Sequence, residues 1–506
     1  MLDYIIIQAG GKGTRLGYLT KNKPKALVPV ENLPMIFHLF RKYPEKKFII
    51  IADYKKEVLK NYLSGFSFVR YQVVEAAGTG TCSGLGQAME LLPKKEPFML
   101  VWADLILPEN FELPEGYRDN AAYSKDDYIG ISSTFPCRWK YKDGSFSEER
   151  SFSHGVAGFF LFHDVSSLSA VPESGELVRW MKEQEMKFRE ISLAGTREFG
   201  LLEEYQKLEE VKTRPFNRIT VNENVLIKEA VDLQGEDLAR QERIWYERAK
   251  KNHIAGIPRI YALNPLKMEL IHGSNIYETG RNREEKHRIL SALVDMLKSL
   301  HQSETVPADS FSMKEAYFNK TMKRLSKIED LVPFGRERYI RVNGRMCRNI
   351  FFYRNKLEYA LEQLKCEHFS FIHGDCTFSN LMLRENGDPV LIDPRGYFGF
   401  TELYGDERYD WAKLYYSIVG NYDRFNLKKF TMDIGNDADE GVRLSIESNG
   451  WEDMEDDFFA LTRANPCEIK LLHAVIWLSL TTYAWQDYDS ICGAFYNGIY
   501  YLEEVL

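Results

Sequence analysis

The segment FIHGDCTFSNLMLRENGDPVLIDPRG, residues 371–396, contains side chains whose types and spacing suit phosphoryl transfer. Asn380 follows Asp375 by five positions, and Asp393 follows an apolar run that predicts a strand ending at Ile392. Phosphoryl transfer needs an acceptor hydroxyl held in line and metal ions that neutralise charge between the phosphates. We therefore expect Asp375 to act as the catalytic base or to orient the hydroxyl, and Asn380 and Asp393 to bind Mg²⁺.

The order D-x-x-x-x-N is that of a kinase catalytic loop. The segment resembles the aminoglycoside phosphotransferase and choline kinase superfamily, whose loop reads HGD where protein kinases have HRD. This resemblance implies a two-lobed, protein-kinase-like fold and ATP as the phosphoryl donor. It also implies that Asp410, in the segment GDERYDWAKLYYSI, supports the loop, while we interpret His373 as a packed structural residue. A signalling protein kinase is disfavoured because DPRG replaces DFG at Asp393 and no APE segment follows.

The residues upstream fit the N-terminal lobe of such a kinase. The stretch VKTRPFNRITVNENVLIKEAV, residues 211–231, predicts a hairpin and then a strand with Lys228 in an apolar setting. Lys228 would bind the α- and β-phosphates of ATP. The next predicted helix carries Glu242, which the resemblance makes the ion-pair partner of Lys228. Glu247, on the same helix, is the rival for that role.

A second motif lies at residues 4–36, YIIIQAGGKGTRLGYLTKNKPKALVPVENLPMI, where an apolar strand leads into a glycine-rich turn and a lysine-rich loop. Glycines let a backbone approach a triphosphate closely, and amide groups with a cation offset its charge. The candidate nucleotide-binding residues of the turn are Gly10, Gly11, Gly13, Thr14 and Arg15. Lys25 would stabilise the α-phosphate during attack, so we expect Lys25 and Arg15 to be catalytic. A dinucleotide fingerprint fails at Leu16, and a Walker loop fails because Gly13 follows Lys12.

This motif resembles the sugar-phosphate nucleotidyltransferase family, whose pattern is GGxGTRL followed by PKxLxPV. The resemblance implies a Rossmann-like domain, with a mixed sheet flanked by helices, that uses CTP, UTP or GTP. It makes Gly84, in GTGTCSGLGQAMEL, the contact with the base. It makes Asp104, which follows the apolar run FMLVW, a magnesium ligand at the carboxyl edge of the sheet.

One position departs from the family pattern. Family members commonly have a metal-binding aspartate two residues before a Gly-Thr or Gly-Ser pair, whereas EISLAGTREFG has Leu193 there. Because a leucine cannot bind magnesium, Glu190 or another carboxylate substitutes, or the site uses fewer protein ligands, or the activity is weakened. We favour the first two explanations because the other motif positions are filled.

The length of the chain agrees with two catalytic units, since 506 residues exceed the size at which one hydrophobic core keeps growing. We expect an α/β protein with a nucleotidyltransferase domain at residues 1–208 and a kinase domain at residues 212–506. The kinase lobes would span about 212–275 and about 276–506. The charged segment Glu203–Pro215 is the predicted junction.

Charge and cysteine content restrict the partners and the compartment. The net charge is −8 and the basic residues are dispersed, which argues against nucleic-acid binding. Seven cysteines without a C-x-x-C pair favour a reduced, cytoplasmic setting. The start MLDYIII does not fit a signal peptide, and the longest apolar run, Leu471–Trp485, is too short and polar to span a membrane. We therefore expect small-molecule substrates, with Mg²⁺, ATP and a second NTP; no signal for an oligomeric state is present.

The two activities would act in series to give a nucleoside-diphosphate-activated precursor for a capsule, a lipopolysaccharide or a related surface polymer. The acceptor is either a sugar, which the GGKGTRL motif favours, or choline or another amino alcohol activated with CTP, which the choline-kinase-like half favours. Some C-terminal aromatic residues could then form a cation–π cage for a quaternary ammonium, although most fit a core better. They are Trp411, Tyr415, Tyr416, Trp477, Tyr483, Trp485 and Tyr488. The alternative is a kinase with a degenerate, nucleotide-sensing N-terminal domain.

Overall fold

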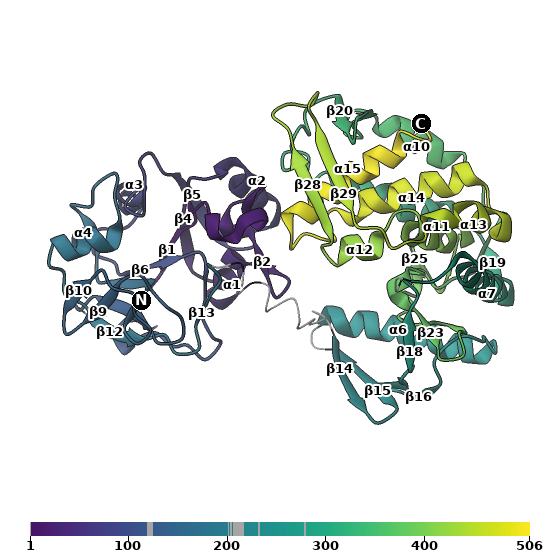
Figure 1. Ribbon diagram of the computed structural model, residues 1–506, viewed down its shortest axis with the longest axis horizontal. Coiled ribbons are helices and arrows are strands. Elements are labelled where there is room, and N and C mark those ends of the chain that lie inside the picture. Colours follow the sequence, from purple (N-terminus) through teal and green to yellow (C-terminus); the bar gives the residue numbers. More distant parts are fainter. Residues whose placement is uncertain are drawn as a thin grey trace. The chain divides into compact units, whose positions relative to one another are not determined.

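The computed structural model describes residues 2–118, 125–200, 202, 205, 217–230, 233–277 and 280–506. Contacts between Cα atoms divide the chain into two compact units (Figure 1). The first comprises Met1–Thr213 with Gln486–Tyr488, and the second Arg214–Trp485 with Asp489–Leu506. The predicted junction, Glu203–Pro215, lies outside the described residues except for Tyr205. The domain boundaries drawn from the sequence stay a prediction.

The first unit is built on a mixed sheet with the strand order β10-β9-β11-β6-β1-β4-β5, to which β8 and β12 add beside β11. The strands are β1 (Tyr4–Gln8), β4 (Lys47–Ala52), β5 (Arg70–Glu75), β6 (Phe98–Trp102), β8 (Tyr128–Ser132), β9 (Lys140–Lys142), β10 (Ser145–Ser147), β11 (Gly155–Phe162) and β12 (Arg189–Ser192). Strand β1 runs parallel to both β4 and β6, while β11 runs antiparallel to β6. Continuous apolar runs in β1, β4 and β6 fit strands covered on both faces.

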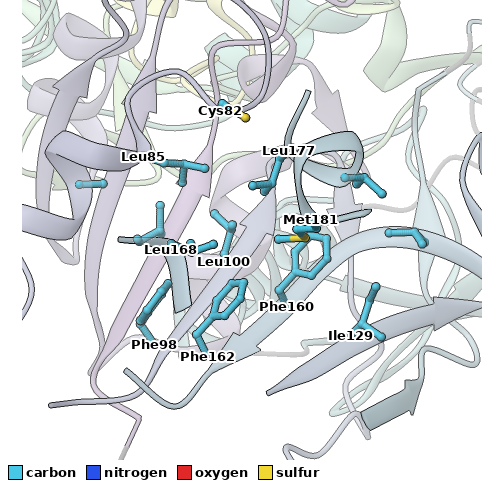
Figure 2. Close-up of a cluster of buried hydrophobic side chains, with 14 of the residues drawn as sticks. Cys82, Leu85, Phe98, Leu100, Ile129, Phe160, Phe162, Leu168, Leu177 and Met181 are labelled. Carbon is cyan, nitrogen blue, oxygen red and sulfur yellow. The ribbon is translucent and has the colours of Figure 1, made fainter. Parts of the chain in front are cut away.

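Short helices and strand pairs surround this sheet. The elements are η1 (Thr14–Thr20), η2 (Lys25–Leu27), β2 (Pro29–Val30), β3 (Leu33–Pro34), α1 (Met35–Lys42), α2 (Lys56–Phe66), α3 (Leu85–Glu90), β7 (Leu105–Ile106), η3 (Glu115–Tyr117), η4 (Val165–Leu168), α4 (Leu177–Glu183) and β13 (Arg197–Glu198). On one face of the sheet, Phe98 of β6 and Phe162 of β11 stack with ring centroids 5.1 Å apart. Leu177 and Met181 of α4 complete this buried cluster (Figure 2). The core thus fixes β6, whose carboxyl end leads to Asp104.

The N-terminal part of the second unit is a four-stranded antiparallel sheet with one long helix. Its elements are β14 (Asn217–Asn222), β15 (Val225–Ala230), α6 (Leu233–Lys251), β16 (Ile260–Leu263) and β17 (Leu266–Glu269), and the strand order is β14-β15-β17-β16. The hairpin between β14 and β15 turns at Glu223 and Asn224, as its asparagine-rich sequence predicts. Helix α6 brings Glu242 toward β15.

The rest of the second unit is mainly helical. Its helices are α7 (Arg283–Ser303), α8 (Ser310–Lys314), η5 (Glu315–Asn319), α9 (Lys320–Leu325), α10 (Arg354–Glu362), η6 (Phe378–Asn380), α11 (Glu407–Ile418), α12 (Tyr422–Asn426), η7 (Glu452–Met454), α13 (Glu455–Thr462), α14 (Pro466–Leu480) and α15 (Tyr488–Leu502). Helix α14 is buried along most of its length and contains the first ten residues of the apolar run Leu471–Trp485. Among the described residues, no helix combines the length and apolar character that crossing a bilayer would need.

Short strands lie on either side of the loop that carries Asp375. They are β18 (Gly273–Asn275), β19 (Thr305–Pro307), β22 (His368–Phe371), β23 (Leu381–Arg384), β24 (Pro389–Leu391), β25 (Tyr397–Phe398), β26 (Thr401–Glu402) and β27 (Tyr404–Gly405), while β20 (Tyr339–Val342), β21 (Arg345–Arg348), β28 (Phe430–Ile434) and β29 (Val442–Ile446) form a separate sheet. Strands β23 and β24 pair antiparallel, and this hairpin separates Asn380 from Asp393. The hairpin therefore holds two predicted site residues at its two ends.

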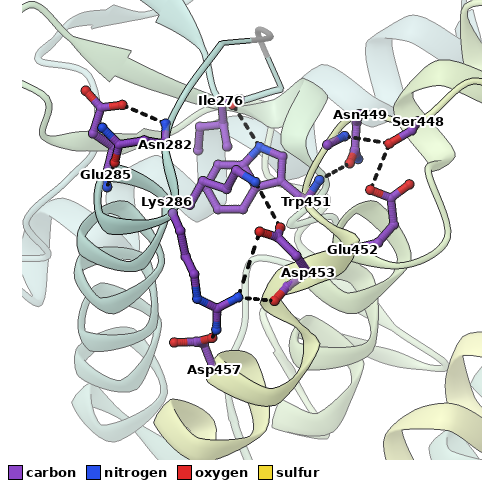
Figure 3. Close-up of polar contacts among 12 residues, drawn as sticks. Ile276, Asn282, Glu285, Lys286, Ser448, Asn449, Trp451, Glu452, Asp453 and Asp457 are labelled. Carbon is purple, nitrogen blue, oxygen red and sulfur yellow. Dashed lines mark hydrogen bonds and ion pairs between the residues drawn. The ribbon is translucent and has the colours of Figure 1, made fainter.

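Polar contacts fasten the start of α7 to the segment before α13 (Figure 3). Asn282 caps α7 by accepting from the Glu285 amide, and the Glu285 carboxylate accepts from the Asn282 amide. Lys286 Nζ lies 2.9 Å from Asp453, and the buried Trp451 donates its indole N–H to the Ile276 carbonyl at 3.3 Å. These contacts anchor the chain where it leaves β18 and enters α7.

Candidate functional sites

The buried Asp410 of α11 fixes the backbone of the loop that follows β22. Its carboxylate accepts hydrogen bonds from the amides of His373 at 2.8 Å and Gly374 at 2.7 Å. His301 Nε2 donates to the same carboxylate at 3.0 Å. Burial opposes the charge of Asp410, but the contacts with His301 and His373 outweigh it and lower the pKa of Asp410. Asp410 thus supports the loop from behind, as the resemblance implies.

Asp375 lies in this loop and is surrounded by donors. Asn380 Nδ2 donates to the Asp375 carboxylate at 3.1 Å, and Lys413 Nζ and Arg395 lie 3.0 Å and 3.4 Å from its two oxygens. Burial works against the ionised form, but Lys413 and Arg395 hold the pKa of Asp375 well below its usual range. Asp375 is therefore a fixed anion, suited to orient an acceptor hydroxyl by accepting its hydrogen bond.

Lys228 forms a buried cluster with two carboxylates. Its Nζ lies 2.7 Å from Glu242 Oε2 and 2.9 Å from Asp393 Oδ1. Burial opposes the charge on the lysine, but Asp393 and Glu242 outweigh it and raise the pKa of Lys228. Glu247, the rival candidate, is exposed on α6. The structure thus brings together β15, α6 and Asp393, which lies two residues after β24, although these segments are far apart in the sequence.

Asn380 and Asp393 provide the oxygen ligands that magnesium prefers. The Ile392 amide donates to the Asn380 carbonyl at 3.0 Å, so the two ends of the β23–β24 hairpin lie side by side. Mg²⁺ is commonly held by one or two protein oxygens together with phosphate oxygens and water. These residues therefore fit a magnesium–nucleotide complex, in which Mg²⁺ would neutralise phosphate charge.

In the first unit, the predicted phosphate-binding lysine meets the predicted metal-binding aspartate. Lys25 begins η2, Asp104 follows β6, and Lys25 Nζ donates to Asp104 Oδ2. Asp104 is buried to 7% exposure, which shields the pair from water. The cation and the carboxylate therefore meet at the carboxyl edge of the sheet, where ligands bind in open α/β folds.

The glycine-rich turn lies against this pair. Gly13 has a φ of +65°, and a Cβ there would lie 3.1 Å from the Lys25 Cβ, so both the backbone conformation and the close approach favour glycine. A Cβ on Gly10 would lie 2.8 Å from the Cβ of Asp53. Thr14 and Arg15 are exposed beside the turn. This arrangement leaves backbone amides and a cation available for a triphosphate.

Gly11 and Gly84 are glycines for different structural reasons. A Cβ on Gly11 would meet nothing within 4 Å, so the space beside it is open. Gly84, at the start of α3, has a φ of +78°, and a Cβ there would lie 2.6 Å from Ile51. Backbone conformation and packing against β4 account for Gly84, and its contact with a base stays a prediction.

A carboxylate that the sequence did not single out, Glu198, lies beside Asp104. Glu198 of β13 pairs with Leu105 of β7, the residue after Asp104. Burial and Asp104 raise the pKa of Glu198, while Lys25 and Arg15 act in the opposite direction. All four charged groups are thus near one another. The only sequence signal was the position of Glu198 shortly after the Gly-Thr pair that Leu193 precedes.

Leu193 and Glu190 take no part in this cluster. Leu193 is fully buried, and its Cδ1 would lie 2.6 Å from a Cβ on Gly130. Glu190 is exposed on β12. Within the described ranges, no group of three or more His, Cys, Asp or Glu side chains could hold a metal. Two carboxylates still fit Mg²⁺, which takes its other ligands from phosphates and water.

Comparison with known families gives two matches in this chain. Residues 5–112 match the MobA-like NTP transferase domain, and residues 231–424 match the phosphotransferase enzyme family. The chain is therefore an α/β enzyme that contains a nucleotidyltransferase domain followed by a phosphotransferase domain. The predicted fused architecture and the predicted fold class are confirmed.

Two curated relatives each align with only part of this chain. The bifunctional protein GlmU of Methanocaldococcus jannaschii is 31% identical over 116 residues, which are 22% of this chain and 27% of that protein. A probable glucose-1-phosphate cytidylyltransferase of Bacillus subtilis is 31% identical over 85 residues, or 16% of this chain and 34% of that protein. The chain thus spans about a third or less of these two relatives.

Two solved structures align with similar coverage. The inositol-1-phosphate CTP transferase of T. maritima is 14% identical with a TM-score of 0.33, and the alignment covers 42% of this chain and 98% of that one. The CTP:phosphocholine cytidylyltransferase of Streptococcus pneumoniae is 22% identical with a TM-score of 0.32, covering 41% and 97% of the two chains.

Proposed function

We propose that this enzyme phosphorylates a small hydroxyl compound with ATP and then transfers a nucleoside monophosphate from a second NTP to the resulting phosphomonoester. The observation that carries the proposal is the pair of charged sites in one chain. Lys228 with Glu242 and Asp393 forms one, and Lys25 with Asp104 forms the other. Each site contains a lysine that can bind phosphate and one or two carboxylates that can bind a metal ion. Both reactions need these groups.

In the first reaction, the acceptor hydroxyl hydrogen-bonds to Asp375 and faces the γ-phosphate of ATP. Lys228, held by Glu242, positions the α- and β-phosphates, and Asn380 and Asp393 bind the magnesium that accompanies ATP. Because Asp375 is strongly ionised, its main contribution is to orient the hydroxyl. The product is a phosphate monoester.

In the second reaction, an oxygen of this monoester attacks the α-phosphorus of the NTP and pyrophosphate leaves. Lys25 and Arg15 stabilise the negative charge that develops around the α-phosphate. Asp104 and Glu198 are the ligands proposed for magnesium in this domain. Glu198 supplies the carboxylate that Leu193 lacks, which favours a catalytic domain over the alternative of a nucleotide-sensing module.

The product of the two steps is an activated compound attached to a nucleoside diphosphate. A transferase that moves the activated group onto a growing surface polysaccharide, of the capsule or lipopolysaccharide type, would consume it. Because both proposed reactions consume nucleoside triphosphates, we expect them to take place in the cytoplasm.

The proposal is tested by incubating the purified protein with magnesium, ATP, each of CTP, UTP and GTP, and a panel of acceptors, while ADP and pyrophosphate are followed separately. We expect both products with one acceptor and one NTP. ADP without pyrophosphate, even when phosphomonoesters are supplied directly, would instead support the sensing alternative.

A further inference from the structure

A cavity beside Asp375 opens to solvent and has about 510 Å³ of empty volume, solvent at its mouth included; all of its lining residues belong to the second unit. None of Lys228, Glu242, Asn380 or Asp393 lines it, so it lies on the acceptor side of the kinase site. Its charged lining is strongly unbalanced. Four cationic side chains, Lys320, Arg324, Arg395 and Lys413, share it with Asp375, the one acidic side chain among its described lining residues.

Two of these cations have no carboxylate partner among the residues that the structure describes. Arg395 and Lys413 pair with Asp375, whereas no ion pair of Lys320 or Arg324 occurs in the described parts of the chain. Lys320 and Arg324 are four residues apart on α9 and therefore share one face of the helix. Arg324 donates to Ser479 Oγ at 2.9 Å, which holds its guanidinium at the cavity wall. Positive charge thus exceeds negative charge around the cavity.

The local electrostatics agree with this excess. Burial, together with Arg324, Arg395 and Lys413, lowers the pKa of Lys320 to about 7, and Glu315 offsets only part of this effect. Cations buried near one another are costly unless a counter-ion joins them. An anion in the cavity would remove that cost.

Three of the five tyrosines that line the cavity already face protein cations. Lys320 Nζ lies 5.7 Å from the Tyr409 ring centroid, and Lys413 Nζ lies 5.6 Å from that of Tyr416. The Arg324 and Arg395 guanidinium groups lie 5.7 Å and 5.6 Å from the Tyr483 ring centroid. A quaternary ammonium could stack on any of these three rings only by displacing the cation there, and four cationic side chains of the lining would repel it.

We propose that the acceptor of the kinase site carries an anionic group, a carboxylate or a phosphate, in addition to its reacting hydroxyl. Lys320 and Arg324 bind the anion, while Asp375 accepts a hydrogen bond from the hydroxyl. The acceptor oxygen bonds to the γ-phosphorus, the bond to the bridging oxygen breaks, ADP leaves with that electron pair, and the hydroxyl proton passes to solvent. This assignment rests on the proposed kinase function and disfavours choline and other amino alcohols.

The test compares small alcohols that differ in charge: glycerate and glycerol 3-phosphate, neutral glycerol, and cationic choline. Binding to the full-length protein loaded with Mg²⁺ and ADP is measured by calorimetry, and ADP formation from ATP is measured separately. We expect an anionic alcohol to bind about tenfold or more tighter than glycerol or choline, on the scale of one charged hydrogen bond. The preference between glycerate and glycerol 3-phosphate tells a carboxylate from a phosphate. Equal or tighter binding of glycerol or choline, or no binding at all, overturns the proposal.

Variants on α9 test whether Lys320 causes the preference for an anionic acceptor. Lys320→Gln should raise the KM for the preferred anionic acceptor about tenfold with little change in kcat. Lys320→Glu should shift the preference toward choline. Lys323→Gln, on the same helix but exposed and outside the cavity lining, is the matched control and should change neither constant. An unchanged KM in Lys320→Gln contradicts the assignment.

The two proposals can fail separately. If anionic alcohols bind but no alcohol yields ADP, the kinase function fails while the anion-binding cavity stands. If choline or glycerol is phosphorylated with the higher kcat/KM, the kinase function stands and the anionic acceptor is wrong.

Discussion

Glu198 pairs across two short strands with Leu105, the residue that follows Asp104, and this pairing brings together two carboxylates from distant parts of the chain. Lys25 contacts Asp104, and both Lys25 and Arg15 influence the ionisation of Glu198. The position where the family has an aspartate is instead filled by the buried Leu193. Glu198 is therefore the carboxylate that we propose in place of the missing aspartate, and for this reason we propose catalysis rather than sensing for the first domain.

Glu198→Gln tests this assignment. The loss of one magnesium ligand should lower pyrophosphate release from a supplied phosphomonoester by roughly 10- to 100-fold, and additional Mg²⁺ should partly restore it. ADP formation should not change. The control is Glu190→Gln, which alters an exposed carboxylate on β12. If Glu190→Gln had the larger effect, Glu190 and not Glu198 would be the magnesium ligand, which would contradict our assignment.

Glu242→Gln tests the phosphate-binding lysine of the kinase. The change removes one of the two carboxylates that contact Lys228, so the lysine should be less well positioned for ATP. We expect kcat/KM for ATP to fall about tenfold or more, measured by ADP formation. Glu247→Gln, on the exposed side of the same helix, should leave it unchanged. Comparable losses in both variants would argue that the helix, and not the ion pair, matters.

The pH dependence of acceptor binding tests the charge of the cavity. The pKa of Lys320 is lowered to about 7, so the side chain is charged below that pH and neutral above it. Affinity for a carboxylate acceptor should therefore fall as the pH rises through 7, whereas the acceptor's own charge stays constant there. The other charged groups around Lys320 are Arg324, Arg395, Lys413 and Glu315. Lys320→Arg should flatten the profile because a guanidinium stays protonated. A wild-type affinity that does not change between pH 6 and about 8.5 would contradict this reading.

Much of the arrangement of the candidate kinase site could be predicted because three of its residues lie close together in the sequence. Asp375, Asn380 and Asp393 fall within one loop–hairpin segment. The family resemblance, with the order along the chain, singled out Lys228 and Glu242, whose side chains are in contact in the structure. Glu198 was missed because its place depends on a strand pairing between segments far apart in the sequence. No local pattern distinguishes such a glutamate from one on a solvated surface.

The cationic cavity also could not be predicted from the sequence. Lys320 and Arg324 come from a helix that carries no recognisable motif, and packing of α9 against α14 places them in the cavity beside Asp375. The C-terminal aromatic residues singled out in the sequence pointed to the cavity only in part. Trp411, Tyr415 and Trp477 are buried, as expected for core residues, while Tyr416 and Tyr483 line the cavity. Residue types alone could not show that cations already occupy the faces of those rings.

The most direct test of two separable activities is a crossed pair of variants. Asp375→Ala and Asp104→Ala are each assayed for ADP formation from the acceptor and for pyrophosphate release from its supplied phosphomonoester. We expect Asp375→Ala to lose ADP formation by roughly a hundredfold or more with pyrophosphate release intact, and Asp104→Ala to show the reverse. Equal damage to both reactions by either change would contradict two separate active sites.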